Sequence, residues 1–463
     1  MKNTGQRILL ALLLAAAGLG PIASPAADVL VWNLQRDRVD ADIGRADLQA
    51  VLGRISAATG WDIYIEPKTS LSVSAKFKNL PRDEALKLLL GKLNYAFWRQ
   101  TNGVSRLAVY RTTPVQATVL IRSPENAAAK KGAIPNELIV TLKPGIKIDD
   151  LARLLGARVV GRAEGLNSYR LQFSDESAAR LAQTQLAADP SVASVDANFY
   201  MEPPPSAEAT GLSGPLPFNL KPNAVGDANH LIVGLIDSPL QKMGGAMDQF
   251  LLPSISVAGE TVPANNSPTH GTSMGETILR GLANMSDEAD AEGSRVRILP
   301  VDVYGASQKT TTFDVAQGIY TAVNNGAMII NLSLGSPGDS QILHSVIESA
   351  HDQGVLLFAA AGNEPTTAPT YPAAYPEVIA VTAGDRKGNI AGYANRGSFV
   401  DIVTPGSTIV SFNNKLYFVS GTSASTAYAA GLAAGLADSS GKPLGQVESA
   451  LRKTFAVSTS TPR

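Results

Sequence analysis

The chain has 463 residues, of which 44% are apolar and 17% charged, so it is long enough for two or three domains with sizeable cores. Its formal net charge is −1 and it has no long run of lysine and arginine, which argues against nucleic acid as a partner. It has no cysteine, which excludes disulfides, thiol catalysis, thiolate metal sites and lipid attachment to a lipobox cysteine.

Residues 1–26 have the features of a secretory signal peptide. Lys2 and Arg7 supply a positive start, an apolar stretch rich in Leu and Ala covers 8–20, and the small residues 24–26 offer a cleavage site. An uncleaved membrane anchor is the alternative, but the stretch is shorter than the roughly 20 residues that a span requires. We therefore expect an exported protein, periplasmic or secreted, with no membrane span in the mature chain.

Residues 27–111 are expected to form a small α+β domain. Apolar residues recur at helical spacing over 48–55 and 86–93. Alternating residues predict strands at 62–66, 73–77, 95–99 and 107–111. This pattern resembles the short N-terminal (STN) domain shared by secretins and TonB-dependent receptors. The resemblance implies a Gram-negative envelope and a protein-binding role, and a generic small α/β module is the alternative.

The next part of the chain is expected to contain a second small domain between two linkers. Residues 112–133 form the first linker, in which 115–122 could still be a strand. Residues 134–202 have the order β-α-β-β-α-β of a split βαβ, or ferredoxin-like, module. Its strands are expected at 137–142, 157–161, 168–173 and 192–199, and its helices at 149–155 and from a Ser174 cap to about 188. Residues 203–218 begin with three prolines and lack an apolar period, so they are expected to be loose.

From residue 219 to 463, short apolar runs alternate with helical patterns. Buried strands are predicted at 231–236, 296–301, 327–332, 355–360 and 378–381, and helices near 270–282, 312–324 and 340–353. Such alternation predicts an α/β domain, a parallel sheet covered by helices on both faces.

Four short segments of this last domain carry groups suited to acyl transfer. Asp237 ends an apolar strand, His270 opens a helix in Thr-His-Gly-Thr, and Asn363 follows a strand in Ala-Gly-Asn-Glu. Ser423 lies in Gly-Thr-Ser-Ala-Ser, before a helix expected from about Thr426. A serine needs a base to take its proton, a histidine suits that task near neutral pH, and a carboxylate holds the histidine in the right tautomer. The order Asp, His, Ser is one of the known chain orders of such a triad.

These segments resemble those of the subtilases, the subtilisin-like serine peptidases of family S8, over essentially all of residues 220–455. The resemblance implies that Ser423 is the nucleophile, that His270 is the general base and then acid, and that Asp237 orients His270. It also implies an oxyanion hole formed by the Asn363 side chain and the Ser423 backbone N–H.

The resemblance further implies a substrate-binding segment. Ser333, Leu334 and Gly335 would bind the peptide as an added strand through backbone hydrogen bonds. Ala361 and Gly362 would belong to a pocket wall of small residues, consistent with an apolar substrate side chain.

The split βαβ module looks like the subtilase propeptide, which acts as a folding chaperone and inhibitor. By this resemblance the chain is made as a zymogen that cleaves itself within the stretch 203–218. The domain 219–463 would then be the mature serine endopeptidase, acting on peptide or protein substrates.

The chain departs from the subtilase pattern at three positions without losing a catalytic group. Pro239 stands where a glycine is usual, Ser273 where a second histidine is common, and Ala427 where a proline usually follows the nucleophile. These departures leave open a second hypothesis, in which a weak or inactive subtilase scaffold presents residues 27–111 to an envelope protein.

Other candidate sites have simpler explanations. Singly, the four site residues could be helix caps or turn residues, and their coincidence favours a site. His344 and His351 lie seven apart on one predicted helix, which favours a solvated or packed face. The acidic run 287–292 lacks an EF-hand pattern and favours a solvated loop. We therefore predict no metal site and no required cofactor, with calcium possible but not shown by the sequence.

Overall fold

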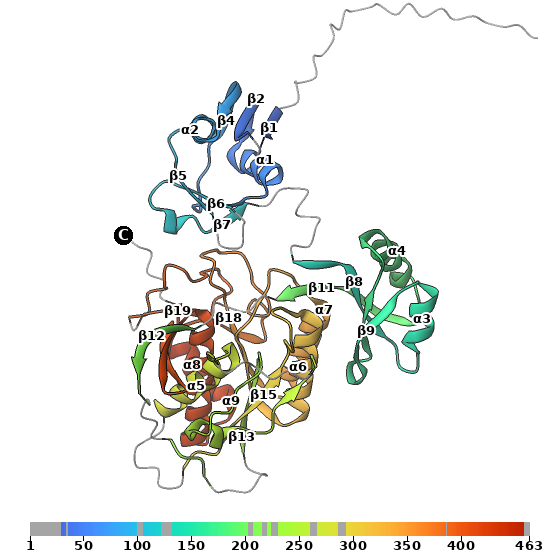
Figure 1. The fold of residues 1–463 in the computed structure, drawn as a ribbon, viewed down its shortest axis with the longest axis vertical. Coiled ribbons are helices and arrows are strands. Elements are labelled where there is room, and N and C mark those ends of the chain that lie inside the picture. The colour runs from blue at the N-terminus through green and yellow to red at the C-terminus, as the bar shows by residue number, and fades with distance from the viewer. Residues whose placement is uncertain are drawn as a thin grey trace, which may run out of the picture.

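The computed structural model describes residues 29–33, 36–99, 105–121, 132–201, 207–214, 220–223, 230–259, 266–285, 293–385 and 387–457. Figure 1 shows three bodies: N-terminal elements at the top, a small sheet with two helices at the right, and a large lower body. Among the described residues, no helix combines the length and the apolar character that a membrane crossing requires.

The N-terminal domain, residues 29–121, has two small sheets and two helices. One antiparallel sheet has the order β1 (Val29–Asn33), β2 (Arg38–Asp47), β4 (Ser72–Pro81). The other has the order β5 (Asn94–Arg99), β6 (Ser105–Tyr110), β3 (Asp62–Ile65), β7 (Val119–Ile121). Helices α1 (Leu48–Thr59) and α2 (Arg82–Leu90) pack into the same apolar core. The strand considered possible at 115–122 is realised as β7, after a short 3₁₀ helix at Pro114–Gln116.

Residues 133–201 form the predicted split βαβ module. Its elements are β8 (Ala133–Leu142), α3 (Ile148–Leu154), β9 (Arg158–Ala163), β10 (Ser168–Gln172), α4 (Glu176–Ala187) and β11 (Val192–Met201). The strands lie in the order β11-β8-β10-β9 and all pair antiparallel. The prediction that Ser174 caps this helix was wrong. Asp175 is the N-cap of α4, because its carboxylate accepts the Ala178 N–H at 2.9 Å.

The C-terminal domain is built on the predicted parallel sheet. Its order is β14 (Ile255–Ser256), β15 (Val296–Asp302), β13 (Leu231–Asp237), β17 (Ala327–Leu332), β18 (Leu356–Ala360), β19 (Val378–Gly384), β20 (Ile402–Pro405). Helices α5 (His270–Ala283), α8 (Thr422–Ser440) and α9 (Leu444–Thr454) cover one face, and α6 (Thr312–Asn324) and α7 (Gln341–Asp352) cover the other.

Both faces of this sheet are buried, which explains its uninterrupted apolar strands. Successive side chains of a strand point to opposite faces. Ile329 and Phe358 therefore pack with α5 and α8, while their neighbours Ile330 and Leu357 pack with α6 and α7. A strand buried on both faces has no polar side to alternate with.

The strand order reverses at β13, which has β15 on one side and β17 on the other. In open parallel sheets, sites form at the carboxyl ends of strands beside such a reversal. Asp237 is the last residue of β13, and Ser333 follows the last residue of β17. The topology therefore brings two of the candidate segments to one edge of the sheet.

The stretch 203–218, expected to be loose, contains a strand. β12 (Glu208–Ser213) pairs antiparallel with β22 (Lys415–Ser420), which pairs in turn with β21 (Ser407–Phe412). None of the β12 side chains is buried. Because no face of β12 enters a core, its sequence carries no apolar alternation to predict it from.

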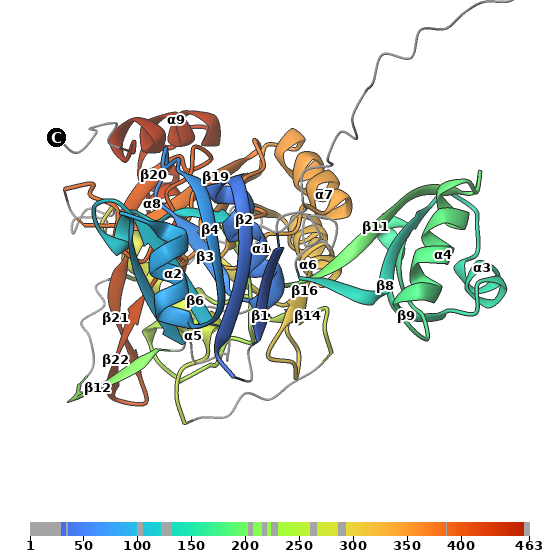
Figure 2. The same ribbon diagram turned by 90° about the horizontal axis from the view of Figure 1, so that it is seen from above.

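The N-terminal domain rests on the C-terminal domain, as Figures 1 and 2 both show. The Tyr64 hydroxyl donates to the Glu364 carboxylate at 2.8 Å, and the Thr367 N–H donates to the Thr118 carbonyl, also at 2.8 Å. Tyr64 is 1% exposed, and its burial, with the charge of Glu364, raises the pKa of its hydroxyl. The hydroxyl therefore stays a donor to Glu364, the residue next to Asn363.

Candidate active site

Asp237 and His270 form a buried pair at the carboxyl end of β13. His270 Nδ1 lies 2.8 Å from Asp237 Oδ1 and 2.9 Å from Oδ2. A carboxylate only accepts, so Nδ1 carries the proton and the Nε2 lone pair is left free. The exposed fractions are 9% for the His270 side chain and 3% for that of Asp237. The Ser238 N–H donates to the same carboxylate at 2.7 Å, which holds it in place.

The start of α5 is built to bring His270 against Asp237. Thr269 caps the helix by accepting the Thr272 N–H at 3.1 Å, and its hydroxyl donates to the Pro239 carbonyl at 2.7 Å. A side chain at Gly271 would overlap the Ser238 carbonyl oxygen, so only glycine permits this close approach. The Thr-His-Gly-Thr segment is thus explained as the local structure that places the histidine.

Ser423 lies in the first turn of α8, which begins at Thr422 rather than near Thr426 as predicted. Its hydroxyl donates to the Ser333 carbonyl at 3.2 Å, and the Ser333 hydroxyl donates to the Ser423 carbonyl at 3.1 Å. The first N–H groups of a helix have no acceptor within the helix and carry its partial positive charge. Ser423 is therefore placed where backbone N–H groups can stabilise a nearby anion.

Asn363 reaches the same helix start. Its Oδ1 accepts the Thr422 N–H at 2.8 Å and the Thr422 hydroxyl at 3.1 Å. With Oδ1 used in this way, Nδ2 supplies the remaining N–H donors of the amide. Gly421 precedes Thr422 with φ of 138°, a conformation that favours glycine, and a Cβ there would lie 3.1 Å from Asn363 Nδ2.

Ser423 and His270 are not hydrogen-bonded to each other within the described structure. His270 Nε2 is buried without a hydrogen-bond partner, while Ser423 Oγ is turned to the Ser333 carbonyl. The predicted residues thus fall into two groups: Asp237 contacts His270, while Ser423 contacts Ser333 and Asn363 contacts Thr422, the residue before Ser423. Catalytic hydrogen bonds are often long or misaligned before substrate binds.

The two predicted substrate-binding segments lie beside these pairs. Leu334 is 3% exposed and packs into the core under α6 and α7. Ser336, just beyond Gly335, exchanges backbone hydrogen bonds of 2.8 and 2.7 Å with Tyr371. Ala361 is fully buried, and the Gly362 N–H donates to the Thr422 hydroxyl at 3.1 Å. The loop that carries Asn363 is therefore tied directly to the start of α8.

Sequence reasoning missed two residues outside the motifs, one that holds the loop of Asn363 and one that lies within the influence of the Asp237 charge. Asn395 donates from Nδ2 to the Ala361 carbonyl at 2.6 Å and to Thr370 at 3.1 Å, which closes the loop that contains Asn363. Tyr304 is buried, and this burial, with the charge of Asp237, raises the pKa of its hydroxyl. Neither residue belongs to a local motif, so only the three-dimensional structure identifies them.

Glu276 is a second carboxylate on α5, outside the Asp237–His270 pair. Burial raises its pKa, although the Arg280 guanidinium opposes the shift. Its oxygens accept from Arg280 at 2.6 Å and from the Ser411 N–H at 2.8 Å. These contacts explain Glu276 as a structural link between α5 and β21.

Strand β11 of the split βαβ module runs onto the C-terminal domain. Tyr200 and Met201 pair antiparallel with β16 (Thr310–Thr311), and Met201 is fully buried. Asp196 accepts the Ser340 hydroxyl at 2.8 Å and the Gln341 N–H at 2.6 Å, at the start of α7. The start of α7 is therefore capped by a residue of the other module, since Ser340 makes no side-chain cap of its own.

The same strand also reaches the start of α6. Asn198 accepts the Thr312 hydroxyl at 3.1 Å and the Phe313 N–H at 3.3 Å. Arg170, on strand β10 of the same sheet, forms an ion pair of 3.3 Å with Asp314, whose pKa is raised by its burial. The module thus supplies acceptors for the orphan N–H groups of two helices of the C-terminal domain.

Comparison with known proteins agrees with this architecture. Residues 228–457 match the model of the subtilase family, and residues 121–198 match that of the fervidolysin N-terminal prodomain. Fervidolysin from Fervidobacterium pennivorans shares the fold, with a TM-score of 0.53 and 18% identity over 69% of this chain and 56% of that one.

Two sequence relatives are similar to part of the chain. Thermitase of Thermoactinomyces vulgaris is 36% identical over 200 residues, 43% of this chain and 71% of that protein. M-protease of Shouchella clausii is 35% identical over 188 residues, 39% of this chain and 50% of that protein, so the chain spans half the length of this relative. From its fold, its family match and its identity to thermitase, the chain belongs to the subtilase family.

Proposed function

We propose that the chain is a serine endopeptidase that hydrolyses peptide bonds through an acyl-enzyme on Ser423. The observation that carries this proposal is the buried pair of Asp237 and His270, with Nδ1 held at 2.8 Å and Nε2 without a partner. A histidine oriented in this way is poised to accept a proton through Nε2. The alternative of a binding scaffold has no comparable observation in its favour.

The proposed first half-reaction uses each group once. The Ser423 hydroxyl turns from the Ser333 carbonyl to His270, Nε2 takes its proton, and Oγ bonds to the substrate carbonyl carbon. The resulting oxyanion accepts from the Ser423 N–H and Asn363 Nδ2, an interaction whose loss in subtilisin costs about 10²–10³ in kcat. Nε2 then returns the proton to the leaving amine as the C–N bond breaks, which leaves the acyl-enzyme.

The second half-reaction repeats these steps with water. His270 takes a proton from the water that attacks the ester carbon, and returns it to Ser423 Oγ as the acid product leaves. Ser333, Leu334 and Gly335 are proposed to pair with the peptide backbone, and Ala361 and Gly362 to line a substrate pocket. No metal or other cofactor takes part in these steps.

A fluorophosphonate probe tests this function, because it labels only an activated serine. We expect one labelled peptide, containing Ser423, in the matured wild-type chain and none in Ser423→Ala. Absence of labelling in the full-length chain alone would be explained by a bound prodomain. If removal of residues 132–201 also exposes no reactive serine, the peptidase function is wrong and the scaffold hypothesis replaces it.

We further propose that the fervidolysin-like prodomain makes the protein a self-processing zymogen. Its strand β11 pairs with β16 and caps α6 and α7, so it stabilises helices that adjoin the substrate segment. The cut is proposed within 203–218, beyond the end of β11 at Met201. The mature peptidase then keeps the prodomain as an inhibitor until it is degraded.

Asp196→Ala is expected to weaken inhibition by the prodomain. The substitution removes two hydrogen bonds to a buried carboxylate, worth about 2–4 kcal/mol together. That loss corresponds to an inhibition constant raised about 30- to 700-fold, measured with residues 132–201 added to the matured enzyme. Asp175→Ala is the matched control, since Asp175 caps α4 within the prodomain and is exposed. Equal effects of both substitutions would contradict the capping role of Asp196.

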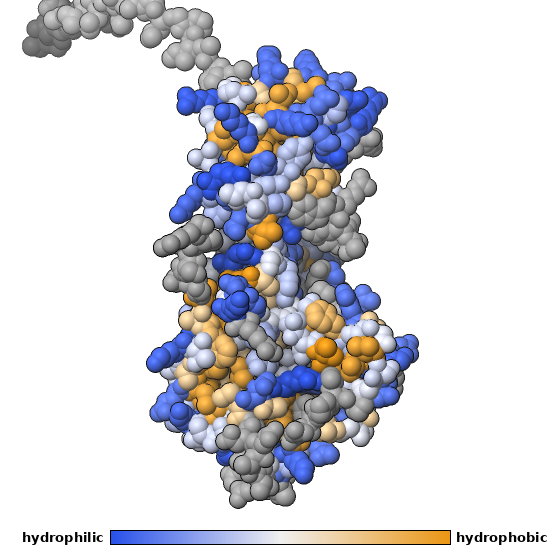
Figure 3. All heavy atoms as spheres, turned by 90° about the vertical axis from the view of Figure 1, so that its left-hand side faces the viewer, coloured by the Kyte–Doolittle hydropathy of each residue, from blue (hydrophilic) through white to orange (hydrophobic). Residues whose placement is uncertain are grey.

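Residues 1–26 are proposed to export the chain to a Gram-negative periplasm. There, the N-terminal domain is proposed to bind an envelope protein. Val29 and Val31 on edge strand β1 are 47% and 54% exposed, and Figure 3 shows apolar side chains at the surface of this domain, at the top of the view. We expect a photo-crosslinker placed at Val29 to capture a periplasmic protein, and Val31→Asp to abolish that crosslink. A chain that keeps residues 1–26, or crosslinks unaffected by Val31→Asp, would contradict these assignments.

A further inference from the structure

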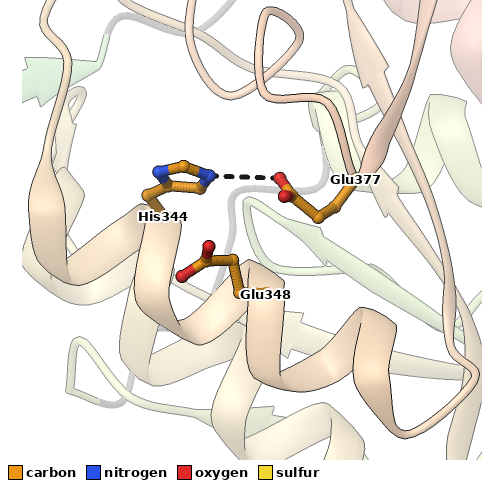
Figure 4. Close-up of side chains that lie close together, drawn as sticks. All are labelled: His344, Glu348 and Glu377. Carbon is orange, nitrogen blue, oxygen red and sulfur yellow. Dashed lines mark hydrogen bonds and ion pairs between the residues drawn. The ribbon is translucent and has the colours of Figure 1, made fainter.

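Three metal-ligating side chains meet on the face of the C-terminal domain formed by α7 and the approach to β19. His344 and Glu348 lie one turn apart on α7, and Glu377 immediately precedes β19 (Figure 4). One ligand atom from each of the three lies within 4.8 Å of the others. None of these residues belongs to the proposed peptidase mechanism.

The cluster has a net negative charge that a bound cation would neutralise. His344 Nε2 lies 3.1 Å from Glu377 Oε2, so the histidine has one of the two carboxylates as a partner. Glu348 has neither a hydrogen bond nor an ion pair from its side chain within the described residues, and Figure 4 shows its carboxylate below the other two groups. Two carboxylates and one imidazole carry a net negative charge, which a divalent cation would offset.

The imidazole is held in a fixed orientation. It stacks on Tyr375 with a centroid distance of 4.2 Å and an angle of 3° between the ring planes. The Tyr375 hydroxyl is itself fixed, because it accepts the Ser340 N–H at 3.0 Å and contacts the Asp339 carboxylate at 3.1 Å. A ligand ring that is already oriented loses little freedom when it binds a metal.

We propose that His344, Glu348 and Glu377 bind one divalent transition-metal ion of the Zn²⁺ type. Imidazole with carboxylates suits Zn²⁺ better than Ca²⁺, which takes six to eight oxygen ligands. Ligand bonds of about 2.0–2.2 Å place the donor atoms of a tetrahedral site about 3.4 Å apart. The 3.1 Å between His344 and Glu377 is close to this value, and the exposed Glu348 side chain completes the set by a small movement, with water as the fourth ligand.

Such an ion would cross-link α7 to the segment that leads into β19. That segment contains Tyr371, whose backbone bonds to Ser336 beside the proposed substrate strand. The start of α7 is also the point that Asp196 of the prodomain caps. The ion would therefore stabilise this face of the domain, and its binding does not depend on the peptidase function.

Zinc binding to the full-length Ser423→Ala chain, which cannot process itself, tests the site. After treatment with a chelator, we expect one equivalent of Zn²⁺ by calorimetry and a rise in Tm on adding the metal. His344→Gln removes a direct ligand, so it should weaken binding more than the about 10- to 100-fold that loss of an outer-shell partner costs. Glu348→Gln changes an exposed side chain, which keeps the test valid if the histidine variant folds poorly.

His351→Gln is the matched control, because His351 lies on the same helix and outside the cluster. It should bind zinc as the parent chain does. The inference is overturned if the parent chain binds no zinc. It is equally overturned if zinc binding survives in both His344→Gln and Glu348→Gln, or if His351→Gln weakens it as much as they do.

Discussion

Replacing Ser423 by alanine is expected to lower kcat by about 10⁶-fold, the loss that removal of the nucleophile causes in subtilisin. The Ser423 hydroxyl donates to the Ser333 carbonyl across a buried contact, whereas the neighbouring Thr422 hydroxyl is already used in a bond to Asn363 Oδ1. The variant should also remain an unprocessed precursor, since self-cleavage requires the same oxygen. Turnover of a chromogenic peptide and the intact mass of the chain measure the two effects.

Ser425→Ala is the matched control for this substitution. Ser425 lies on the same helix, fully buried, and its hydroxyl donates to the Thr404 and Pro405 carbonyls at 3.3 and 3.1 Å, away from Ser333. This variant should mature and turn over substrate. Normal maturation of Ser423→Ala in the absence of any other peptidase would show that the nucleophile lies elsewhere.

The five central strands of the sheet and most of its covering helices could be predicted because burial leaves a strong pattern in the sequence, whereas β14, β20 and α9 were not predicted. Strands such as β13 and β18 are buried on both faces, so each gives an uninterrupted apolar run. β12 gave no such signal, because all its side chains are at least partly exposed and it is held by backbone pairing with β22. Strands β1 and β2 were not predicted either, although Val39, Ala41 and Ile43 alternate inward along β2.

The first residue of a helix was harder to predict where the sequence has no capping residue or has two neighbouring candidates. Gly421 precedes α8 without a side-chain cap, so the sequence did not mark Thr422 as the first helical residue. At α4 two neighbouring residues, Ser174 and Asp175, both suit a cap, and only the backbone geometry selects Asp175. At α7 the cap comes from Asp196, far back in the chain, which no local pattern can predict.

The sequence predicts which residues form the candidate site but does not predict their geometry. The strand end at Asp237 and the helix start at His270 are local features, and the sheet topology then brings them into contact. The direction of the Ser423 hydroxyl depends on the Ser333 carbonyl, which belongs to a different strand end. The His344 cluster is a second example of a contact that only the fold reveals, because Glu377 lies outside the helix that carries His344 and Glu348.

Asp237→Asn is expected to lower kcat by about 10⁴-fold, as the equivalent change does in a triad peptidase. An amide that donates to His270 Nδ1 leaves the proton on Nε2, where it cannot accept the proton of Ser423. The substrate segment is untouched, so KM should change little, and measuring kcat and KM separately distinguishes this effect from lost binding.

Asp302→Asn provides the comparison that isolates this tautomer effect. Asp302 ends β15 directly opposite Asp237, and its Oδ1 accepts the Tyr304 and Gly305 N–H groups at 2.9 and 3.0 Å. An asparagine Oδ1 keeps both bonds, so Asp302→Asn should retain most of the activity. A large loss in both variants would mean that the carboxyl end of the sheet needs its negative charge for stability, and the orienting role of Asp237 would then lose its support.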